Sequence, residues 1–199
     1  MKTTAICLNL KGVLRLTEKD KMLNGEFYNP MDTELVTDRM EARKLLYSFN
    51  NSKPSDGIRR KETIKQLFGK TGAKIYIEPP FRCDYGYNIE VGENFYANFD
   101  CVILDVNKVI MGDDVQLGPG VHIYTAVHPT DPEERMSKTE YGEEIEIGNN
   151  VWIGGGAIIC SGVKIGSNTT IGAGSVVTKD ISENVLAVGN PCKVIKKFD

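Results

Sequence analysis

The sequence predicts a mainly β protein whose short strands stack as the coils of a solenoid, with a small helical subdomain before them. Two observations support this prediction: a six-residue repeat in the C-terminal part of the chain, and helix-start signals in the first third. Buried positions recur about every 3.6 residues in a helix and every second residue in a strand, so a period of six fits neither alone. It fits a coil in which each hexapeptide supplies one short strand and one corner.

The repeat is clearest in residues 145–181, where a β-branched aliphatic residue recurs at every sixth position. Glycine follows four of the six, and it suits corners where backbones approach closely or φ is positive. A glycine-rich sheet with chance spacing is the competing interpretation, and six consecutive matches disfavour it. We therefore expect the aliphatic side chains to fill a common interior. They are Ile147, Ile153, Ile159, Ile165, Ile171 and Val177.

The helical prediction concerns residues 17–72. Thr17 precedes an acidic residue by three positions, and Asp32 precedes the long segment 33–50. Both are helix-start signals. A third segment leads to Gly69, a residue that favours a helix stop. Because the ends of a solenoid need to be covered, we expect this subdomain to cap the first coil and to contribute residues to a functional site.

The six-residue spacing begins before residue 145, since it links Val91 to Val109 and, after a two-residue slip, Met111 to Ile123. It then stops in a polar stretch with two prolines. A long insertion in a rigid solenoid is usually a functional loop. The chain therefore divides into residues 1–16, an N-terminal extension to which we assign no structure; 17–72, the helical cap; 73–187, the solenoid with its inserted loop at 124–144; and 188–199, a basic tail.

The composition is ordinary for a globular protein, with 41% hydrophobic and 26% charged residues in a chain of 199. A net charge of −3 argues against a nucleic-acid partner. No stretch approaches the ~18 apolar residues of a membrane span. Five cysteines without a CxxC motif are typical of reduced thiols. The polar residues Asn9, Lys11 and Arg15 interrupt any signal-peptide pattern, so we expect a cytoplasmic protein.

Two histidines are the candidates for a base that works near neutral pH. His122 falls inside a hexapeptide, so a structural wall position is its simplest interpretation. His128 lies in the interrupting loop with Glu140 and other acidic residues, and spacing alone favours a catalytic base and a surface residue equally. A zinc site shared between β-helices would use three histidines, and a cysteine or carboxylate would have to replace the missing one. We therefore expect no metal.

Six stretches carry a resemblance to a known family: MLNGEFYNP (22–30), PSDGIRRKETIKQLFG (54–69), NFYANFDCVILDV (94–106), IYTAVHPTDPEER (123–135), EIGNNVWIGGGAIICSGVKIGSNTTIGAGSVVTKDI (146–181) and VGNPCKVI (188–195). They resemble the maltose/galactoside O-acetyltransferases. The hexapeptides are shared by many acyltransferases, whereas the N-terminal segment and the loop around His128 are more specific. The resemblance implies a left-handed parallel β-helix, a homotrimer with sites between subunits, and acetyl transfer from acetyl-CoA to a hydroxyl of a maltose-, glucose- or galactoside-type sugar.

By position, the resemblance implies that His128 is the general base that takes the proton of the acceptor hydroxyl, with Asn98 and Glu140 as further catalytic residues. It also implies direct attack of that hydroxyl on the thioester, without an acyl-enzyme. Asn29 stands where relatives often carry an aspartate, a departure that bears on the acceptor preference. The implied substrate-binding residues are Asn29, Asp84, Asn98 and Asp105.

The resemblance further implies a coenzyme A site. A backbone N–H near Gly155 would stabilise the oxyanion of the tetrahedral intermediate. Lys193 and Lys196 form a local positive cluster suited to phosphates, although a solvated tail is their alternative interpretation. Trp152 has plain packing between coils or subunits as its alternative. The implied donor-side residues are Trp152, Gly155, Ala173, Thr178, Lys179, Lys193 and Lys196.

Two other functions remain open on the sequence alone. One is an acetyltransferase of the same fold with a non-sugar acceptor, such as an antibiotic or serine. The helical segment 17–72 argues against it, because this segment resembles the sugar-acetylating group. The other is a non-catalytic or zinc-binding β-helix protein, which bound zinc in an elemental analysis would support.

Overall fold

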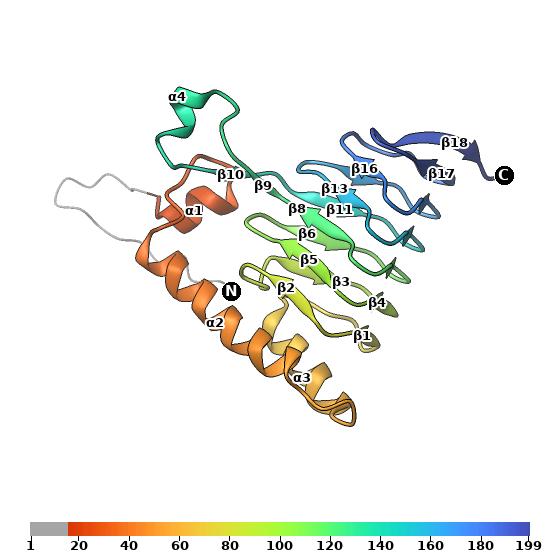
Figure 1. Ribbon diagram of the computed structural model, residues 1–199, viewed down its shortest axis with the longest axis horizontal. Helices are drawn as coiled ribbons and strands as arrows, with labels where there is room; N and C mark the ends of the chain where they lie inside the picture. Colours follow the sequence, from red (N-terminus) through yellow and green to blue (C-terminus); the bar gives the residue numbers. More distant parts are fainter. Residues whose placement is uncertain (1–15) are drawn as a thin grey trace.

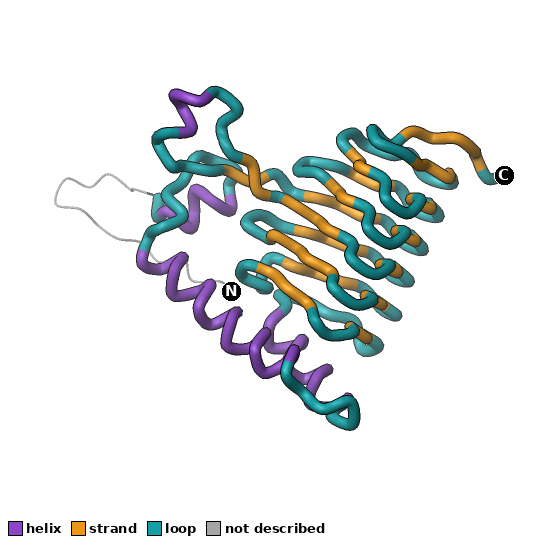
Figure 2. Tube along the Cα trace, in the orientation of Figure 1, coloured by secondary structure: helices purple, strands orange, loops and turns teal. Residues whose placement is uncertain are grey.

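A solenoid of short parallel strands dominates the computed structural model, which describes residues 16–199 (Figure 1). The protein is a left-handed parallel β-helix with an N-terminal helical subdomain, as predicted. Figure 2 shows the strands as short segments separated by corners, with the long helices at one end. The expected extension at residues 1–16 lies, apart from Leu16, outside the described residues.

The helical subdomain begins at the predicted signals. The Thr17 hydroxyl accepts a hydrogen bond from the Asp20 backbone N–H at 3.0 Å, and the Asp20 carboxylate accepts one from the Thr17 N–H at 3.1 Å. Asp32 accepts from the Glu34 N–H at 3.0 Å. These bonds satisfy N–H groups that have no partner inside a helix. The three helices are α1 (Glu18–Leu23), α2 (Thr33–Asn50) and α3 (Gly57–Leu67).

Helices α2 and α3 cover the N-terminal end of the solenoid. Their buried residues Leu46, Phe49, Ile64 and Leu67 belong to the same hydrophobic core as the first coils. The contact removes apolar surface from water at the end where the solenoid would otherwise stop.

The coils build three walls, which the chain visits in a fixed order. Wall A contains seven strands, wall B five and wall C four. All pairs within the walls are parallel except the last pair of wall A. Wall A is β1 (Ile75–Ile77), β4 (Phe95–Ala97), β7 (Gln116–Leu117), β12 (Trp152–Ile153), β15 (Thr170–Ile171), β17 (Val185–Val188) and β18 (Lys193–Lys197). Wall B is β2 (Phe81–Cys83), β5 (Cys101–Leu104), β8 (His122–Tyr124), β13 (Ile158–Ile159) and β16 (Val176–Val177). Wall C is β3 (Ile89–Val91), β6 (Val109–Met111), β11 (Ile145–Ile147) and β14 (Lys164–Ile165).

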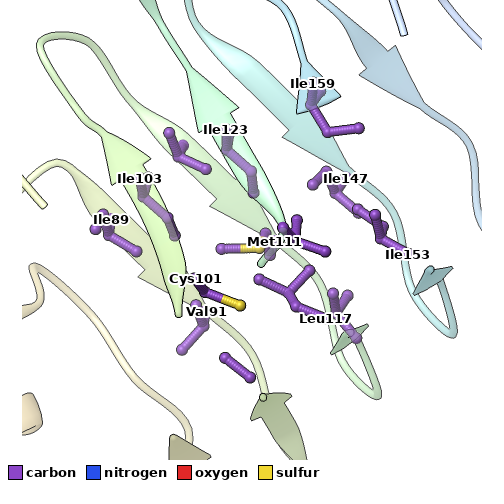
Figure 3. Close-up of a cluster of buried hydrophobic side chains, with 14 of the residues drawn as sticks. Ile89, Val91, Cys101, Ile103, Met111, Leu117, Ile123, Ile147, Ile153 and Ile159 are labelled. Carbon is purple, nitrogen blue, oxygen red and sulfur yellow. The ribbon is translucent and has the colours of Figure 1, made fainter. Parts of the chain in front are cut away.

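The six-residue repeat forms the interior, as predicted. Every aliphatic residue of the series from Ile147 to Val177 is at most 3% exposed. Figure 3 shows Ile103, Ile123 and Met111 from earlier coils pointing into the same interior. Each coil thus contributes aliphatic side chains that the next coil covers, which is how a solenoid builds one continuous core.

Residues 124–144 interrupt the solenoid between β8 and β11, where the sequence predicted an insertion. Strands β9 (Ala126–Val127) and β10 (Tyr141–Gly142) pair antiparallel, and the short helix α4 (Pro132–Arg135) lies between them. In Figure 1 this inserted loop projects from the solenoid on the side of α1.

The C-terminal residues differ from a simple tail. Strand β18 pairs antiparallel with β17, so residues 193–197 extend wall A. All five side chains of β18 are exposed. The lysines of this segment are therefore held on a sheet surface. Among residues 16–199, no helix combines the length and the apolarity that crossing a bilayer requires.

Candidate active site

The inserted loop places His128 and Glu140 side by side. His128 follows β9 and Glu140 precedes β10, so the antiparallel pairing of these strands brings the two residues together. The distance between His128 Nε2 and Glu140 Oε2 is 3.5 Å. The imidazole is 61% exposed, whereas the Glu140 side chain is only 13% exposed. The loop therefore presents an accessible imidazole beside a shielded carboxylate.

Tyr28 holds Glu140 from the other side. The Tyr28 hydroxyl donates a hydrogen bond to Glu140 Oε1. The two backbones pair as well, with Tyr28 N to Glu140 O at 3.0 Å and Glu140 N to Tyr28 O at 3.3 Å. Burial raises the pKa of Tyr28, and the adjacent Glu140 raises it further. The phenol therefore stays protonated and serves as a donor to the carboxylate.

Asp84 is a second carboxyl group near Glu140. It follows β2 at the corner between walls B and C, which we call the B–C corner. Burial raises the pKa of Asp84, and the charge of Glu140 adds to the shift, while Arg39 and Arg43 oppose it. The pKa of Asp84 thus responds to the charge of Glu140, and we call these two carboxyl groups the acidic region.

Asp105 is placed differently from the expected sugar contact. It is fully buried, and its two oxygens accept hydrogen bonds from the backbone N–H groups of Asp84, Tyr85 and Gly86 at 2.7–3.0 Å. Burial raises the pKa of Asp105 to about 7, although these donors oppose the shift. The side chain is thus used in holding the turn that carries Asp84, and no face of it is open to a ligand.

The role of Asp105 follows a pattern that is repeated along the B–C corner. Side chains along the B–C corner each accept a backbone N–H from the preceding coil, which ties successive coils together. Asp105 is the buried, charged member of that series. The other members are Thr125, which accepts from Asn107, Ser161, which accepts from Glu143, and Asp180, which accepts from Lys164.

Asn29 lies next to Tyr28 and is exposed. Its side-chain oxygen accepts a hydrogen bond from the Met31 N–H at 3.0 Å, and its own N–H donates to Glu18 at 2.6 Å. The oxygen is engaged in a local turn before α2. The amide nitrogen is the group that Asn29 could offer to an acceptor.

Asn98 and His128 do not meet within one chain. Asn98 follows β4 at the corner between walls A and B, which we call the A–B corner, and its side-chain oxygen accepts from the Phe99 N–H at 2.8 Å. His128 belongs to the loop inserted at the B–C corner. The strands of wall B, such as Cys101–Leu104, separate the two corners. The structure therefore places these two residues at opposite edges of wall B.

The expected donor residues are divided in the same way. Gly155 and Ala173 lie at the A–B corner, where the Gly174 N–H donates to Gly155 O at 2.9 Å. A Cβ on Gly155 would come within 3.0 Å of the Pro119 carbonyl oxygen, so a side chain is poorly tolerated there. Trp152, Lys193 and Lys196 are exposed on wall A, and Thr178 and Lys179 are exposed at the B–C corner.

Sequence reasoning did not identify Tyr28 as part of the site. The residue stands inside the stretch MLNGEFYNP, beside Asn29, but nothing local to it shows a partner 112 positions away. The one general indication is that a buried tyrosine, here 1% exposed, needs a hydrogen-bond partner for its hydroxyl.

In residues 16–199, three or more metal-binding side chains do not gather at any point.

The comparisons with known proteins identify the family to which the chain belongs. Residues 21–72 match the maltose acetyltransferase hexapeptide capping motif, and residues 144–179 match the six-repeat bacterial transferase hexapeptide. The galactoside O-acetyltransferase of Escherichia coli K12 is 42% identical over 180 residues, which are 90% of this chain and 89% of that enzyme.

Two solved structures are similar over nearly their full length. A maltose O-acetyltransferase from Clostridium difficile 630 has a TM-score of 0.92 and 55% identity, covering 92% of this chain and 98% of that one. A galactoside acetyltransferase in complex with coenzyme A has a TM-score of 0.90 and 41% identity, covering 93% of this chain and 92% of that one.

Proposed function

The chain belongs to the maltose/galactoside O-acetyltransferase family of hexapeptide-repeat enzymes, and we propose that it acetylates a sugar hydroxyl with His128 as the general base. It is an acetyl-CoA-dependent acetyltransferase, as its similarity to these enzymes shows. The role of His128 is supported by the pairing of its exposed imidazole with the shielded Glu140 carboxylate, 3.5 Å apart, on the inserted loop.

In the proposed reaction, His128 accepts the proton of the acceptor hydroxyl while the oxygen attacks the thioester carbonyl. The backbone N–H near Gly155 stabilises the oxyanion that forms. When the C–S bond breaks, the imidazolium returns its proton to the leaving sulfur. The products are an O-acetyl ester and a free thiol, so atoms and charge balance.

Two cysteine environments support direct transfer without an acyl-enzyme. Burial raises the pKa of Cys101 to about 11. Burial also raises the pKa of Cys160. A thiol nucleophile works as its thiolate, so neither residue is prepared for covalent catalysis.

A sugar is the acceptor that the acidic region best supports. Asp84 provides a carboxyl group whose pKa responds to the charge of Glu140, the residue beside His128, and hydroxyl groups of a sugar donate hydrogen bonds to carboxyl oxygens. The match of residues 21–72 to the maltose acetyltransferase capping motif favours a sugar over an antibiotic or serine.

We also propose a homotrimer with active sites between subunits. The A–B corner of one subunit, with Asn98 and Gly155, would face the B–C corner of the next, with His128 and Thr178. Such a heterologous contact closes into a ring. It would complete both the acceptor and the donor side, which a single chain leaves at opposite edges of wall B.

The outer surface of wall B supports this assembly. Its apolar residues Val102, Ile158 and Val176 lie in one row with His122. They are half-buried in the single chain. An apolar face of this kind is suited to burial between subunits around a threefold axis. In that arrangement His122 has a structural place in the wall.

The test is an assay of thiol release from acetyl-CoA with a panel of sugars. We expect release with at least one sugar, and His128→Ala should lower kcat by about 100-fold or more while the protein stays folded, the scale of a lost general base. Full activity of His128→Ala would show that the base is wrongly assigned. If no sugar leads to thiol release and an antibiotic or serine does, the acceptor is that compound and not a sugar.

A further inference from the structure

Tyr28 joins the helical subdomain to the loop that carries His128. It lies between α1 and α2, and its side chain is packed among Met22, Leu35 and Val106 in a second hydrophobic cluster. From this cluster its hydroxyl reaches Glu140 Oε1, and its backbone makes two hydrogen bonds with the same residue. The contact is thus anchored at the ring, the hydroxyl and the main chain.

This arrangement divides the two oxygens of the Glu140 carboxylate. Oε1 accepts from Tyr28, and Oε2 lies 3.5 Å from His128 Nε2. A hydrogen bond to a charged group restricts the carboxylate more strongly than a neutral pair would. With one oxygen fixed, the plane of the carboxylate is fixed, and the second oxygen stays directed at the imidazole.

We propose that Tyr28 is a positioning residue for the acetyl-transfer reaction, because it fixes the Glu140 carboxylate in the orientation that faces His128. The inference rests on the proposed function of His128 as the general base. Tyr28 acts through Glu140 and does not contact the reacting atoms. The helical subdomain then has a second task besides covering the first coil, since it sets the geometry of the base.

Two charged groups of this region, Arg39 and Asp84, act differently from Tyr28. Arg39 on α2 donates to the Tyr85 hydroxyl at 2.6 Å and to the Pro30 carbonyl, so these two hydrogen bonds go to partners other than Glu140. Asp84, at the B–C corner, repels the Glu140 carboxylate electrostatically. Tyr28 is the hydroxyl that holds Glu140 against this repulsion.

The experiment is a double-mutant cycle with Tyr28→Phe and Glu140→Gln. Tyr28→Phe keeps the ring and its packing and removes only the hydroxyl. We expect each single change to lower kcat by about 10- to 100-fold, the range of a lost hydrogen bond to a charged group. The KM for acetyl-CoA should stay unchanged. In the Glu140→Gln background, Tyr28→Phe should lower kcat by less than about twofold, because coupled residues are not additive.

Tyr87→Phe is the matched control. Tyr87 packs against the same cluster, and its hydroxyl donates to the Asp38 carboxylate at 3.0 Å, away from the loop. We expect this control to lower the melting temperature about as much as Tyr28→Phe does and to leave kcat unchanged. A loss of kcat in Tyr87→Phe equal to that in Tyr28→Phe would assign the effect to general stability and overturn the inference.

Two further outcomes would contradict it. One is wild-type kcat in Tyr28→Phe. The other is a double variant whose fold-loss of kcat equals the product of the two single fold-losses, which would show that Tyr28 does not act through Glu140.

His128→Ala separates this inference from the proposed function. If His128→Ala is inactive and Tyr28→Phe is fully active, only the role of Tyr28 fails. If His128→Ala is active, the proposed base fails.

Discussion

Asn98 and His128 lie at opposite edges of the same wall, one at the A–B corner and the other on the loop inserted at the B–C corner. The strands of wall B stand between them. If both serve one reaction, they come from two subunits. The proposed assembly can therefore be tested by enzyme activity as well as by the molecular mass of the oligomer.

Mixing two inactive variants should restore activity. A site between subunits needs His128 from one chain and Asn98 from the next. In trimers refolded or co-expressed from equal amounts of His128→Ala and Asn98→Ala, about one site in four would contain both native residues, given random cyclic assembly. We expect thiol release at about a quarter of the wild-type rate. Each variant alone is the control, and mixtures that stay as inactive as the separate variants would contradict a shared site.

A charge on wall B should prevent assembly. Ile158 lies in the row of apolar residues on its outer surface, in register with His122 and Val176. Ile158→Glu would place a carboxylate in the proposed interface, where burying an unpaired charge costs several kcal/mol. We expect a monomer by light scattering and loss of activity.

Ile110→Glu is the matched control for that change. Ile110 is an outward residue of wall C, between Glu90 and Glu146. Because wall C faces away from the proposed threefold axis, Ile110→Glu should leave the assembly unchanged. If Ile110→Glu dissociates the protein and Ile158→Glu does not, wall C and not wall B forms the interface.

Replacing the lysines of β18 should weaken binding of the nucleotide part of acetyl-CoA. Lys193→Ala with Lys196→Ala removes two positive charges that β18 holds on wall A. We expect the KM for acetyl-CoA to rise about 10-fold, the effect of lost charge-assisted contacts with phosphate. The KM for S-acetylpantetheine, which lacks the nucleotide, should not change.

A double change of Lys70→Ala with Lys74→Ala serves as the control for charge alone. Both residues are exposed and precede β1, which lies at the end of the solenoid opposite β18 (Figure 1). This variant should keep the wild-type KM for acetyl-CoA. A rise equal to that of the β18 variant would mean that the total charge of the protein is responsible, and would remove Lys193 and Lys196 from the donor site.

Asp105 should make stability depend on pH. The pKa of this carboxyl is about 7 in the folded chain, above its ordinary value of 3.8. The folded state therefore binds the proton more tightly than the unfolded state does. The resulting stabilisation is complete below the ordinary pKa and is lost as the pH rises through about 7.

We therefore expect the unfolding free energy of the wild type minus that of Asp105→Asn to be more positive at pH 5 than at pH 8, by roughly 3 kcal/mol. Urea unfolding at the two pH values measures it. Asp84→Asn is the companion variant, since the charge of Asp84 contributes to the raised pKa of Asp105. A difference that is equal at both pH values would show that Asp105 does not titrate between them.

The sequence by itself determined the solenoid and its cap. The six-residue period from Ile147 to Val177 is a local pattern, and each coil repeats the same geometry, so burial follows directly from spacing. The helix-cap signals at Thr17 and Asp32 act within one helical turn, so the starts of these helices could also be predicted from the sequence. The position of His128 in an interruption of the repeat, together with the family resemblance, indicated where to look for the base.

Only the tertiary structure decided what these residues meet. Asp105 was expected to contact a sugar, but its corner position turns it onto three backbone N–H groups. Tyr28 meets Glu140 because the inserted loop folds back onto the helical subdomain. Asn98 and His128 are separated because successive corners of a coil lie at opposite edges of a wall. The physical reason is the range of the interaction: spacing and caps act within a few residues, whereas these contacts depend on how whole coils stack and how an insertion docks.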